Sequence, residues 1–497
     1  MSRTLVLSLL RAGDALVHLQ ALAALRAAEP GGELHLLVQA SAGPAVELLA
    51  TQATVHRLPV DYLGGPLGPC QPLVEQLRSL DFDHVVNLTH RLFAAQLAAT
   101  LGQDRAIGFT MVSGRPAVSS PWLAVLNDWG TSSLLSVLHY GDVACQSLGL
   151  AATDPELVRR LPPEAEHWWR EARDRLGVKA GAPMLALQLT TSEPKKTYPP
   201  QRWHAFSSAL AALAPGLAQV AIAGPLEATS VAAALEGTPA KVLSCSLAQA
   251  ARLLASASLL VSGDTALIHL AGLVGTRVLL VSAGSSAFRE LGPTGNDHAV
   301  VQSQWPCAPC AHDPGCLASL SGYPCTVAAE PAELARMALA LLSNDALPAI
   351  TGSVVLFRSC FDSRGLADFR PVGRVAPETA CAELLREHLL ERLPLALSPR
   401  AGPPPPARAL DGAEVQALLE LRRAVEAFHA EAEGLKPGAG RRVIPALSSP
   451  FALAFASAVA ARLRETAPSA GSSLSGELTR LERRIAAALR GGSVAPA

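Results

Sequence analysis

The sequence predicts an α/β protein made of two successive strand–helix units, followed by a mainly helical C-terminal extension. Short apolar strands alternate with Ala/Leu-rich helices from residue 4 onward, which is typical of βαβ units and a parallel sheet. The same rhythm restarts near residue 184. Beyond residue 346 it is replaced by a Pro-rich stretch and by helical apolar stripes.

The first unit is assigned to residues 1–165. It opens with a strand at 4–10 and an Ala/Leu-rich helix at 15–28. The Pro-containing stretch 111–130 interrupts the pattern. Further strands are predicted at 34–38, 55–58 and 84–88, and further helices at 45–50, 73–80 and 131–149.

The second unit is assigned to residues 166–345 and includes a Cys-rich loop at 305–325. Its predicted strands are 184–188, 220–222, 259–262 and 278–282, and its helices are 203–213, 247–255, 268–273 and 331–342. Two such units in succession predict two Rossmann-like domains that face a cleft.

The rest of the chain is divided into three parts. Residues 346–398 form a small α/β extension with one strand at 354–358, residues 399–410 a Pro-rich linker, and residues 411–497 a helical extension. Two apolar stripes at helical spacing predict a small bundle or cap, because two heptads are too few for a coiled coil. A homo-oligomer or a docked partner on these helices is the alternative. The stripes are Leu418, Leu421, Val425, Phe428 and Ala432, and Leu474, Leu478, Leu481, Ile485 and Leu489.

The composition excludes several classes of protein. Lys+Arg (41) and Asp+Glu (42) balance in the 497 residues, so the basic excess of a nucleic-acid-binding protein is missing. A hydrophobic fraction of 49% excludes a disordered chain. The apolar run 5–10 is too short for a signal peptide, and no run reaches the roughly 20 residues of a membrane helix. We expect a cytoplasmic protein with at most peripheral membrane contact.

Three polar motifs lie where a predicted strand passes into a helix. The first is Gly13-Asp14, where the carboxylate is either a general base or a helix cap. The second is the loop 190–199, with Thr190, Thr191 and Lys196. The third is Asp264-Thr265 with His269 one turn later. Hydroxyls, lysines and helix N-termini suit phosphate oxygens, although polar loops and capped helices also contain them.

In order and spacing these motifs resemble glycosyltransferase family 9, the ADP-heptose:lipopolysaccharide heptosyltransferases, over roughly residues 4–345. The resemblance also includes Asp83-His84-Val85-Val86-Asn87-Leu88, Ile107-Gly108-Phe109 and Thr190-Thr191…Lys196-Thr197-Tyr198-Pro199…Trp203. It implies the GT-B fold. Two positions depart from the family pattern, since Ala266 replaces a glycine and Tyr198 replaces a tryptophan.

The resemblance implies a role for each matching residue. Asp14 would be the base that deprotonates the acceptor hydroxyl, beside Gly13 in the substrate site. Contacts to the nucleotide phosphates would come from Thr190, Thr191 and Lys196. Asp264, Thr265 and His269 would close around the diphosphate and heptose, and Glu227 would hold the ribose. No catalytic divalent metal is expected in this scheme.

Four of the nine cysteines fall in one short loop. Cys307, Cys310, Cys316 and Cys325 have the spacing C-x2-C-x5-C-x8-C, which suits a tetrahedral zinc or iron site, whereas unligated thiols are the alternative. His312 could replace one sulfur. Four protein ligands make the expected role structural. The loop resembles a four-Cys iron site of the heptosyltransferases that modify autotransporter adhesins. This resemblance implies that iron competes with zinc for the site.

The function expected from the resemblance is inverting transfer of a heptose, or a related sugar, from an ADP-sugar. The acceptor would be a hydroxyl group of a lipopolysaccharide core or of a protein. A catalytically inactive GT-B scaffold that binds a partner is the alternative, favoured by Ala266. A sugar-nucleotide epimerase of similar fold is a third.

Overall fold

The computed structural model describes most of the chain. The described residues are 2–47, 53–59, 68–129, 133–152, 161, 163–305, 308–310, 316, 322–396, 400, 408–434, 451–452, 454–456, 458–459, 471–491 and 493–494.

The first unit is a six-stranded sheet of order β3-β2-β1-β4-β5-β6. The pairs from β3 to β5 are parallel, and β5 and β6 form an antiparallel hairpin. The chain runs outward from β1 to β3 and then returns to β4 on the other side of β1. Ligands bind at such a reversal of strand order. The strands are β1 (Arg3–Ser8), β2 (Glu33–Gln39), β3 (Thr54–Leu58), β4 (His84–Asn87), β5 (Ala106–Val112) and β6 (Arg115–Val118).

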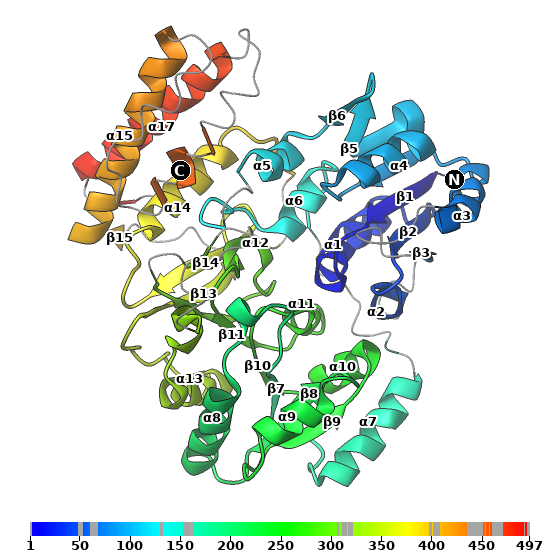
Figure 1. Ribbon diagram of the computed structural model, residues 1–497, viewed down its shortest axis with the longest axis vertical. Helices are drawn as coiled ribbons and strands as arrows, with labels where there is room; N and C mark the ends of the chain where they lie inside the picture. The colour runs from blue at the N-terminus through cyan, green and yellow to red at the C-terminus, as the bar shows by residue number, and fades with distance from the viewer. Residues whose placement is uncertain are drawn as a thin grey trace.

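The helices of the first unit flank this sheet (Figure 1). The first of them, α1 (Ala12–Ala28), is buried over most of its circumference because it also packs on α6 and on a helix of the second unit, α11 (Ala266–Leu273). Small alanine side chains permit this close packing on several sides. The other helices are α2 (Gly43–Glu47), α3 (Gln71–Ser79), α4 (Leu92–Gly102), α5 (Pro121–Trp129) and α6 (Tyr140–Gln146). The next helix, α7 (Pro163–Leu176), lies beside the second unit and packs on α10 (Leu247–Leu254) (Figure 1).

The second unit has an eight-stranded sheet of order β14-β13-β12-β11-β10-β7-β8-β9. From β9 to β12 it is parallel, and it reverses strand order between β7 and β10. Both sheets thus have Rossmann-like order, which confirms the predicted fold class. The strands are β7 (Met184–Gln188), β8 (Ala218–Ala223), β9 (Lys241–Ser244), β10 (Leu259–Ser262), β11 (Val278–Ser282), β12 (Ala299–Ser303), β13 (Val354–Phe361) and β14 (Ala367–Val372).

Apolar side chains of the flanking helices cover this second sheet. Trp203, Phe206 and Leu210 of α8 (Pro200–Leu213) are buried together with Tyr198, whose hydroxyl donates to Ala329 O at 2.8 Å. Tyr198 therefore belongs to the core beside the site. The other helices are α9 (Ala228–Ala234), α10 (Leu247–Leu254), α12 (Phe288–Leu291) and α13 (Pro331–Ser343).

The predicted small α/β extension at 346–398 is continuous with the second sheet. β13 pairs antiparallel with β12, and β14 pairs with β13. In the first unit, the stretch 111–130 contains β6 and α5, where the sequence indicates only an interruption. Both differences involve antiparallel pairing, which depends on a partner strand rather than on local pattern.

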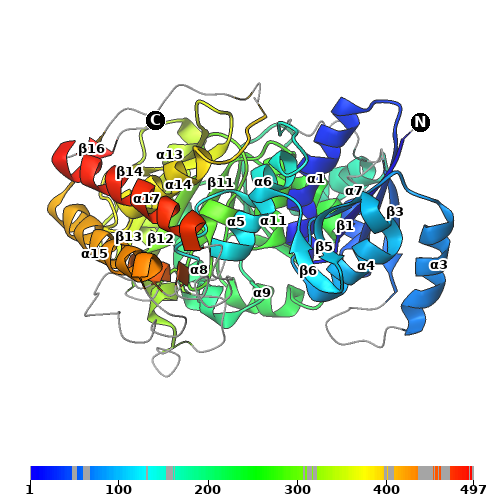
Figure 2. The ribbon, with the colours of Figure 1, turned by 90° about the horizontal axis from the view of Figure 1, so that it is seen from above.

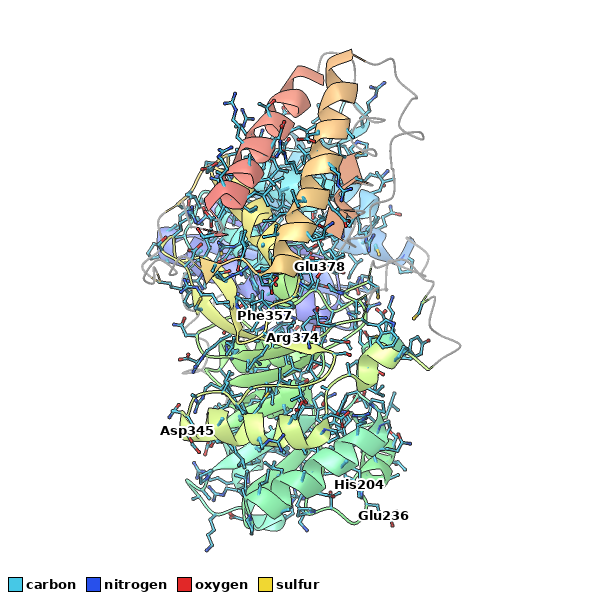
Figure 3. All side chains as sticks on the ribbon, turned by 90° about the vertical axis from the view of Figure 1, so that its left-hand side faces the viewer. His204, Glu236, Asp345, Phe357, Arg374 and Glu378 are labelled. Carbon is cyan, nitrogen blue, oxygen red and sulfur yellow. The ribbon has the colours of Figure 1, made fainter. Side chains whose placement is uncertain are left out.

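The C-terminal extension is helical, as predicted. α15 (Gly412–Gly434) and α17 (Gly471–Gly491) lie side by side and pack on α14 (Thr379–Leu390). Figure 3 shows this helix pair at the end of the molecule opposite His204 and Glu236. The stripe residues Leu418, Leu421 and Val425 of α15 and Leu478, Leu481 and Ile485 of α17 are buried. A two-stranded pair, β15 (Arg408–Ala409) and β16 (Ser493–Val494), joins the two ends of this extension.

A segment after α14 connects the extension to the first unit. Gln146 of α6 exchanges two hydrogen bonds with the backbone of Ala396, and Trp122 Nε1 donates to Pro394 O at 2.7 Å. Arg400 and Asp142 form an ion pair at 2.9 Å, with side chains only 4% and 3% exposed. Figure 2 shows α5 and α6 between the first sheet and the C-terminal helices. The extension thus connects the two units.

None of the helices in the described part of the chain is long and apolar enough to cross a membrane.

Candidate functional site

Asp14 lies in the first turn of α1, after the carboxyl end of β1. The loop that leads to it is fixed by Thr89, whose hydroxyl accepts from the Leu9 N–H at 2.8 Å, and by Gln39, which donates to Leu9 O at 2.9 Å. The Arg11 N–H donates to Asp14 Oδ2 at 3.1 Å. The predicted base is thus also a helix-capping residue, so the two readings of Gly13-Asp14 are compatible.

The carboxyl group of Asp14 is set up to exchange a proton near neutral pH. Burial raises the pKa of Asp14 to about 6, and the Asp264 carboxylate adds to this effect. The Arg11 N–H, the Arg11 guanidinium and the Lys196 ammonium oppose it. A base whose pKa lies just below the working pH is both ionised and able to accept a proton.

Lys196 and Asp264 face each other at the strand-order reversal of the second sheet. Lys196 Nζ donates to Asp264 Oδ2 at 2.9 Å, and the two side chains are 13% and 12% exposed. Lys196 follows β7, and Asp264 follows the neighbouring strand β10. Arg11 Nη1 donates to Ser192 Oγ in the Lys196 loop at 3.1 Å. The start of α1, which carries Asp14, therefore lies beside this loop across the junction of the two units.

The turn after β11 reaches the Lys196 loop. Gly284 has φ +60°, and a Cβ atom there would lie 2.1 Å from Lys195 O. Glycine is therefore required at this close approach. Ser285, next in the chain, has a buried hydroxyl with no hydrogen-bond partner among the described residues. It is a polar group beside the site that sequence reasoning missed.

Helix α11 brings the second unit directly against α1. Thr265 caps α11, its Oγ1 accepting from the Leu267 N–H at 3.3 Å. A Cβ atom on Gly13 would lie 3.3 Å from His269 Cδ2 and 3.7 Å from Ala266 Cα. Glycine at 13 thus lets the two helices approach each other closely.

His269 is buried and neutral. Burial lowers its pKa to about 4, although the Asp264 carboxylate opposes this. Its Nδ1 is buried and has no hydrogen-bond partner within the described part of the chain. This nitrogen is therefore available to a ligand at the junction.

The remaining predicted residues lie at the edges of this cluster. Thr190 Oγ1 accepts from Gln188 Nε2 at 2.8 Å. Thr191 Oγ1 lies 2.6 Å from Thr197 Oγ1. Glu227 precedes α9, and its Oε2 accepts from the Gly224 N–H at 3.0 Å after β8. All three follow carboxyl ends of strands at the same edge of the second sheet.

Glu290 of α12 is a carboxyl group that the sequence analysis did not select. Burial raises its pKa to about 7, a hydrogen bond with Ser136 opposes this, and Asp14 and Asp264 both add to it. No motif singles out this position, because its relation to Asp14 arises only when the two units meet.

The Cys-rich loop is described only in part, because Cys307 and His312 lie outside the described residues. Cys310 and Cys316 are half-buried and Cys325 is buried. Cys310 N–H donates to Gly284 O at 2.9 Å, and Ser133 Oγ donates to Cys310 O at 2.9 Å. The described residues contain no group of three or more His, Cys, Asp or Glu side chains that could hold a metal ion. These two hydrogen bonds place Cys310 at the junction of the two units.

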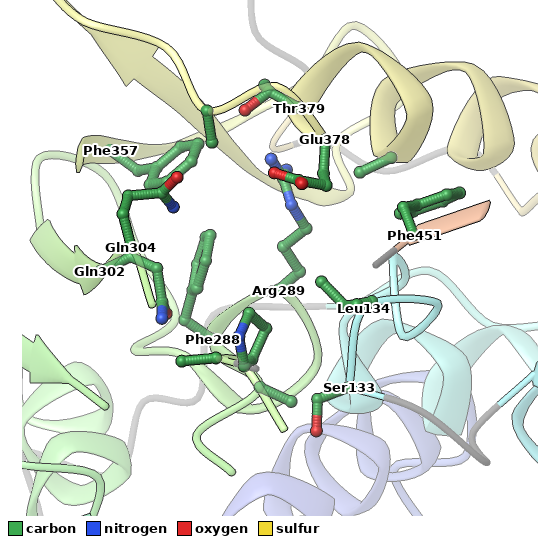
Figure 4. Close-up of a pocket in the computed structure, with 15 residues that line it drawn as sticks. Ser133, Leu134, Phe288, Arg289, Gln302, Gln304, Phe357, Glu378, Thr379 and Phe451 are labelled. Atoms are coloured by element: carbon green, nitrogen blue, oxygen red, sulfur yellow. The ribbon is translucent and has the colours of Figure 1, made fainter. Parts of the chain in front are cut away.

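A pocket that is partly open to solvent lies beside α12 (Figure 4). Its walls include Phe288, Phe357 and Phe451, and the Arg289 guanidinium lies 5.2 and 5.1 Å from the ring centres of Phe288 and Phe357. None of the predicted site residues lines this pocket. It is therefore separate from the cluster around Asp14.

Two Rossmann-like units whose strand-order reversals meet at a half-buried carboxyl and a lysine–carboxylate pair define the architecture as the GT-B fold. A model of glycosyltransferase family 9 (heptosyltransferase) matches residues 71–319, about half of the chain. The chain belongs to this family and is a glycosyltransferase. The matched region contains every predicted substrate-binding residue of the second unit, whereas Asp14 lies before it.

The chain is also similar to several solved structures. The glycosyl transferase family 9 from Veillonella parvula DSM 2008 has a TM-score of 0.47 and 18% identity, covering 59% of this chain and 83% of that one. E. coli ADP-heptose lps heptosyltransferase II has a TM-score of 0.47 and 14% identity, and the match covers 69% of this chain and 99% of that one. The iron-containing dodecameric glycosyltransferase TibC from enterotoxigenic E. coli H10407 has a TM-score of 0.31 and 13% identity, covering 57% and 58%. No curated protein matches the chain.

Proposed function

We propose that this glycosyltransferase moves a heptose, or a related sugar, from an ADP-sugar to a hydroxyl group of a lipopolysaccharide core or of a protein, with inversion at the anomeric carbon. The observation that carries the proposal is that the start of α1, with Asp14, lies beside the loop of the Lys196–Asp264 pair. An inverting transferase needs a base on the acceptor side of the sugar and a charge clamp on the leaving-group side.

The reaction requires one proton transfer and one displacement. Asp14 takes the proton of the acceptor hydroxyl while the acceptor oxygen attacks the anomeric carbon. The bond from this carbon to the β-phosphate oxygen breaks on the opposite face, and ADP departs with the electron pair. Lys196 Nζ and the N–H groups at the start of α11 stabilise the charge of the departing diphosphate.

The other predicted residues hold the donor in this scheme. The hydroxyl groups of Thr190, Thr191 and Thr265 form hydrogen bonds with the phosphates. Neutral His269 forms one through Nδ1 with the diphosphate or the sugar. The Glu227 carboxylate accepts hydrogen bonds from the ribose hydroxyls, and the acceptor site lies in the first unit. No divalent metal takes part in the scheme.

Lys196→Met tests the clamp. Because a hydrogen bond to a charged group contributes about 1.5–3 kcal/mol, we expect the Kd for ADP to rise about 10- to 100-fold in isothermal titration calorimetry. Lys195→Met is the matched control, since Lys195 Nζ is paired with Glu193 at 3.4 Å. The Kd of Lys195→Met for ADP should stay within about threefold of the wild-type value. Equal losses in both variants, or a wild type that binds no ADP-sugar, would contradict the proposal and favour an inactive scaffold.

We further propose that Cys307, Cys310, Cys316 and Cys325 hold one structural zinc or iron ion. Four thiolates are a donor set that both metals accept, and the ion would stabilise the loop whose Cys310 lies between Gly284 and Ser133. We expect elemental analysis of the purified protein to find about one zinc or iron per chain. Cys310→Ser should lower this content, and Cys360→Ser, outside the loop, should not. A metal-free, stably folded protein with four alkylatable loop thiols would refute the site.

The sequence also supports two coarser proposals. The first is a cytoplasmic location, with which the balanced charge of the chain agrees. The second is a homo-oligomer formed through the polar faces of α15 and α17, because the described core of their apolar stripes is buried within the chain. Light scattering of the full chain measures the molar mass, which should be a multiple of the mass of one chain.

A further inference from the structure

Helix α12 lies at the junction of the two units, next to the proposed site. The residues that follow α12 in the chain form hydrogen bonds with the first unit. His139 Nε2 donates to Gly292 O at 3.0 Å, and Gln20 Nε2 donates to Thr294 Oγ1 at 3.0 Å. Gln20 belongs to α1, the helix that carries Asp14, and His139 caps α6. These contacts hold α12 in place relative to Asp14.

The Glu290 side chain leaves α12 toward this junction. It is hydrogen-bonded to Ser136, and the carboxylates of Asp14 and Asp264 and the Lys196 ammonium are all near enough to affect it. Its Oε2 is buried and has no hydrogen-bond partner among the described residues. A buried polar atom without a partner is costly and therefore needs an explanation.

The neighbours of Glu290 indicate what would occupy the space. Asp14 marks the acceptor side of the reacting carbon, and the Lys196–Asp264 pair marks the leaving diphosphate. A group near all three lies beside the transferred sugar. Sugar hydroxyls both donate and accept hydrogen bonds, and a carboxyl group can serve either role.

We propose that Glu290 is a specificity-determining residue whose Oε2 accepts a hydrogen bond from a hydroxyl group of the donor sugar. This inference rests on the proposed function, because it takes the position of the sugar from it. With a pKa of about 7, Glu290 is protonated in a large share of molecules near neutral pH. A protonated Glu290 carries no charge and therefore adds little repulsion against the negatively charged diphosphate.

The test compares the binding of ADP with that of ADP-heptose, since only the second carries the sugar. In isothermal titration calorimetry, Glu290→Leu should raise the Kd for ADP-heptose about 10-fold. The Kd for ADP should stay within about twofold of the wild-type value. Glu290→Ala should behave in the same way, which keeps the test valid if the leucine variant folds poorly. Glu290→Gln should bind ADP-heptose within about threefold of the wild type, because its amide oxygen accepts the same hydrogen bond.

Glu378→Leu is the matched control. Glu378 is another carboxyl group with a pKa raised by burial, and it lines the pocket on the far side of α12 (Figure 4). Its loss should leave both affinities unchanged. Wild-type affinity for ADP-heptose in the Leu and Ala variants would overturn the inference and assign Oε2 to a water molecule. An equal loss for ADP and ADP-heptose would overturn it in favour of a structural role. A wild type that binds neither compound would refute the proposed function itself.

Discussion

Asp14→Asn should lower kcat about 100- to 10,000-fold, the range that a general base contributes. Asparagine has nearly the same shape, and its amide oxygen can still accept the Arg11 N–H that Asp14 accepts at 3.1 Å. It cannot accept a proton from the acceptor hydroxyl. The affinity for ADP should stay equal or rise slightly, because a negative charge near the diphosphate is removed.

The pH dependence of kcat/KM is a second test of the role of Asp14 as the base. Asp14 has a pKa of about 6, and only its ionised form is a base. kcat/KM of the wild type should therefore rise as the pH increases through about 6 and fall away below it. The residual activity of Asp14→Asn should not show this rise.

Asp83→Asn is the control for this experiment. Asp83 Oδ2 also accepts a backbone N–H, that of Arg3 at 2.7 Å, but at the opposite end of β1. Its kcat and pH profile should match the wild type. Transfer at the normal rate by Asp14→Asn would show that another group is the base.

Arg400→Met should destabilise the protein by about 3–5 kcal/mol, because it leaves the carboxylate of Asp142 buried without its counter-charge. Both side chains are almost inaccessible, and the Arg400 guanidinium also lies 4.3 Å from the ring centre of Phe361. Urea unfolding followed by tryptophan fluorescence measures the loss. Trp122 is suited as a reporter, because its Nε1 donates to Pro394 O in the same segment.

The double variant Asp142→Asn/Arg400→Met separates the ion pair from simple loss of packing. Asparagine keeps an oxygen for the Ala367 N–H, which donates to Asp142 Oδ2 at 2.6 Å, and removes the uncompensated charge. The double variant should therefore be more stable than Arg400→Met alone. Arg422→Met breaks an exposed ion pair on α15 and should cost at most about 0.5 kcal/mol. Equal losses for Arg400→Met and Arg422→Met would show that the buried pair does not stabilise the fold.

This ion pair also affects how the two units meet. Asp142 is on α6 of the first unit, and Ala367 begins β14 of the second sheet. The extension therefore helps to hold Asp14 at its position relative to the Lys196–Asp264 pair. Loosening it should lower activity before the protein unfolds, since catalysis depends on exact placement of reacting groups.

The sequence by itself determined the two Rossmann-like units, because the alternation of apolar strands and Ala/Leu helices is a local pattern. It also predicted Asp14, Lys196, Asp264 and His269 as site residues, since each follows a strand end in a motif that resembles the family pattern. The carboxyl ends of parallel strands lie at one edge of a sheet, so motifs far apart in the chain meet there.

Only the tertiary structure decided which groups face one another across the junction. Glu290 carries no motif, and Arg400 pairs with a residue 258 positions away. β13 joins the second sheet through antiparallel contacts that depend on the exposed edge of β12. Such contacts leave no local periodicity in the chain, because burial and pairing with a distant segment create them.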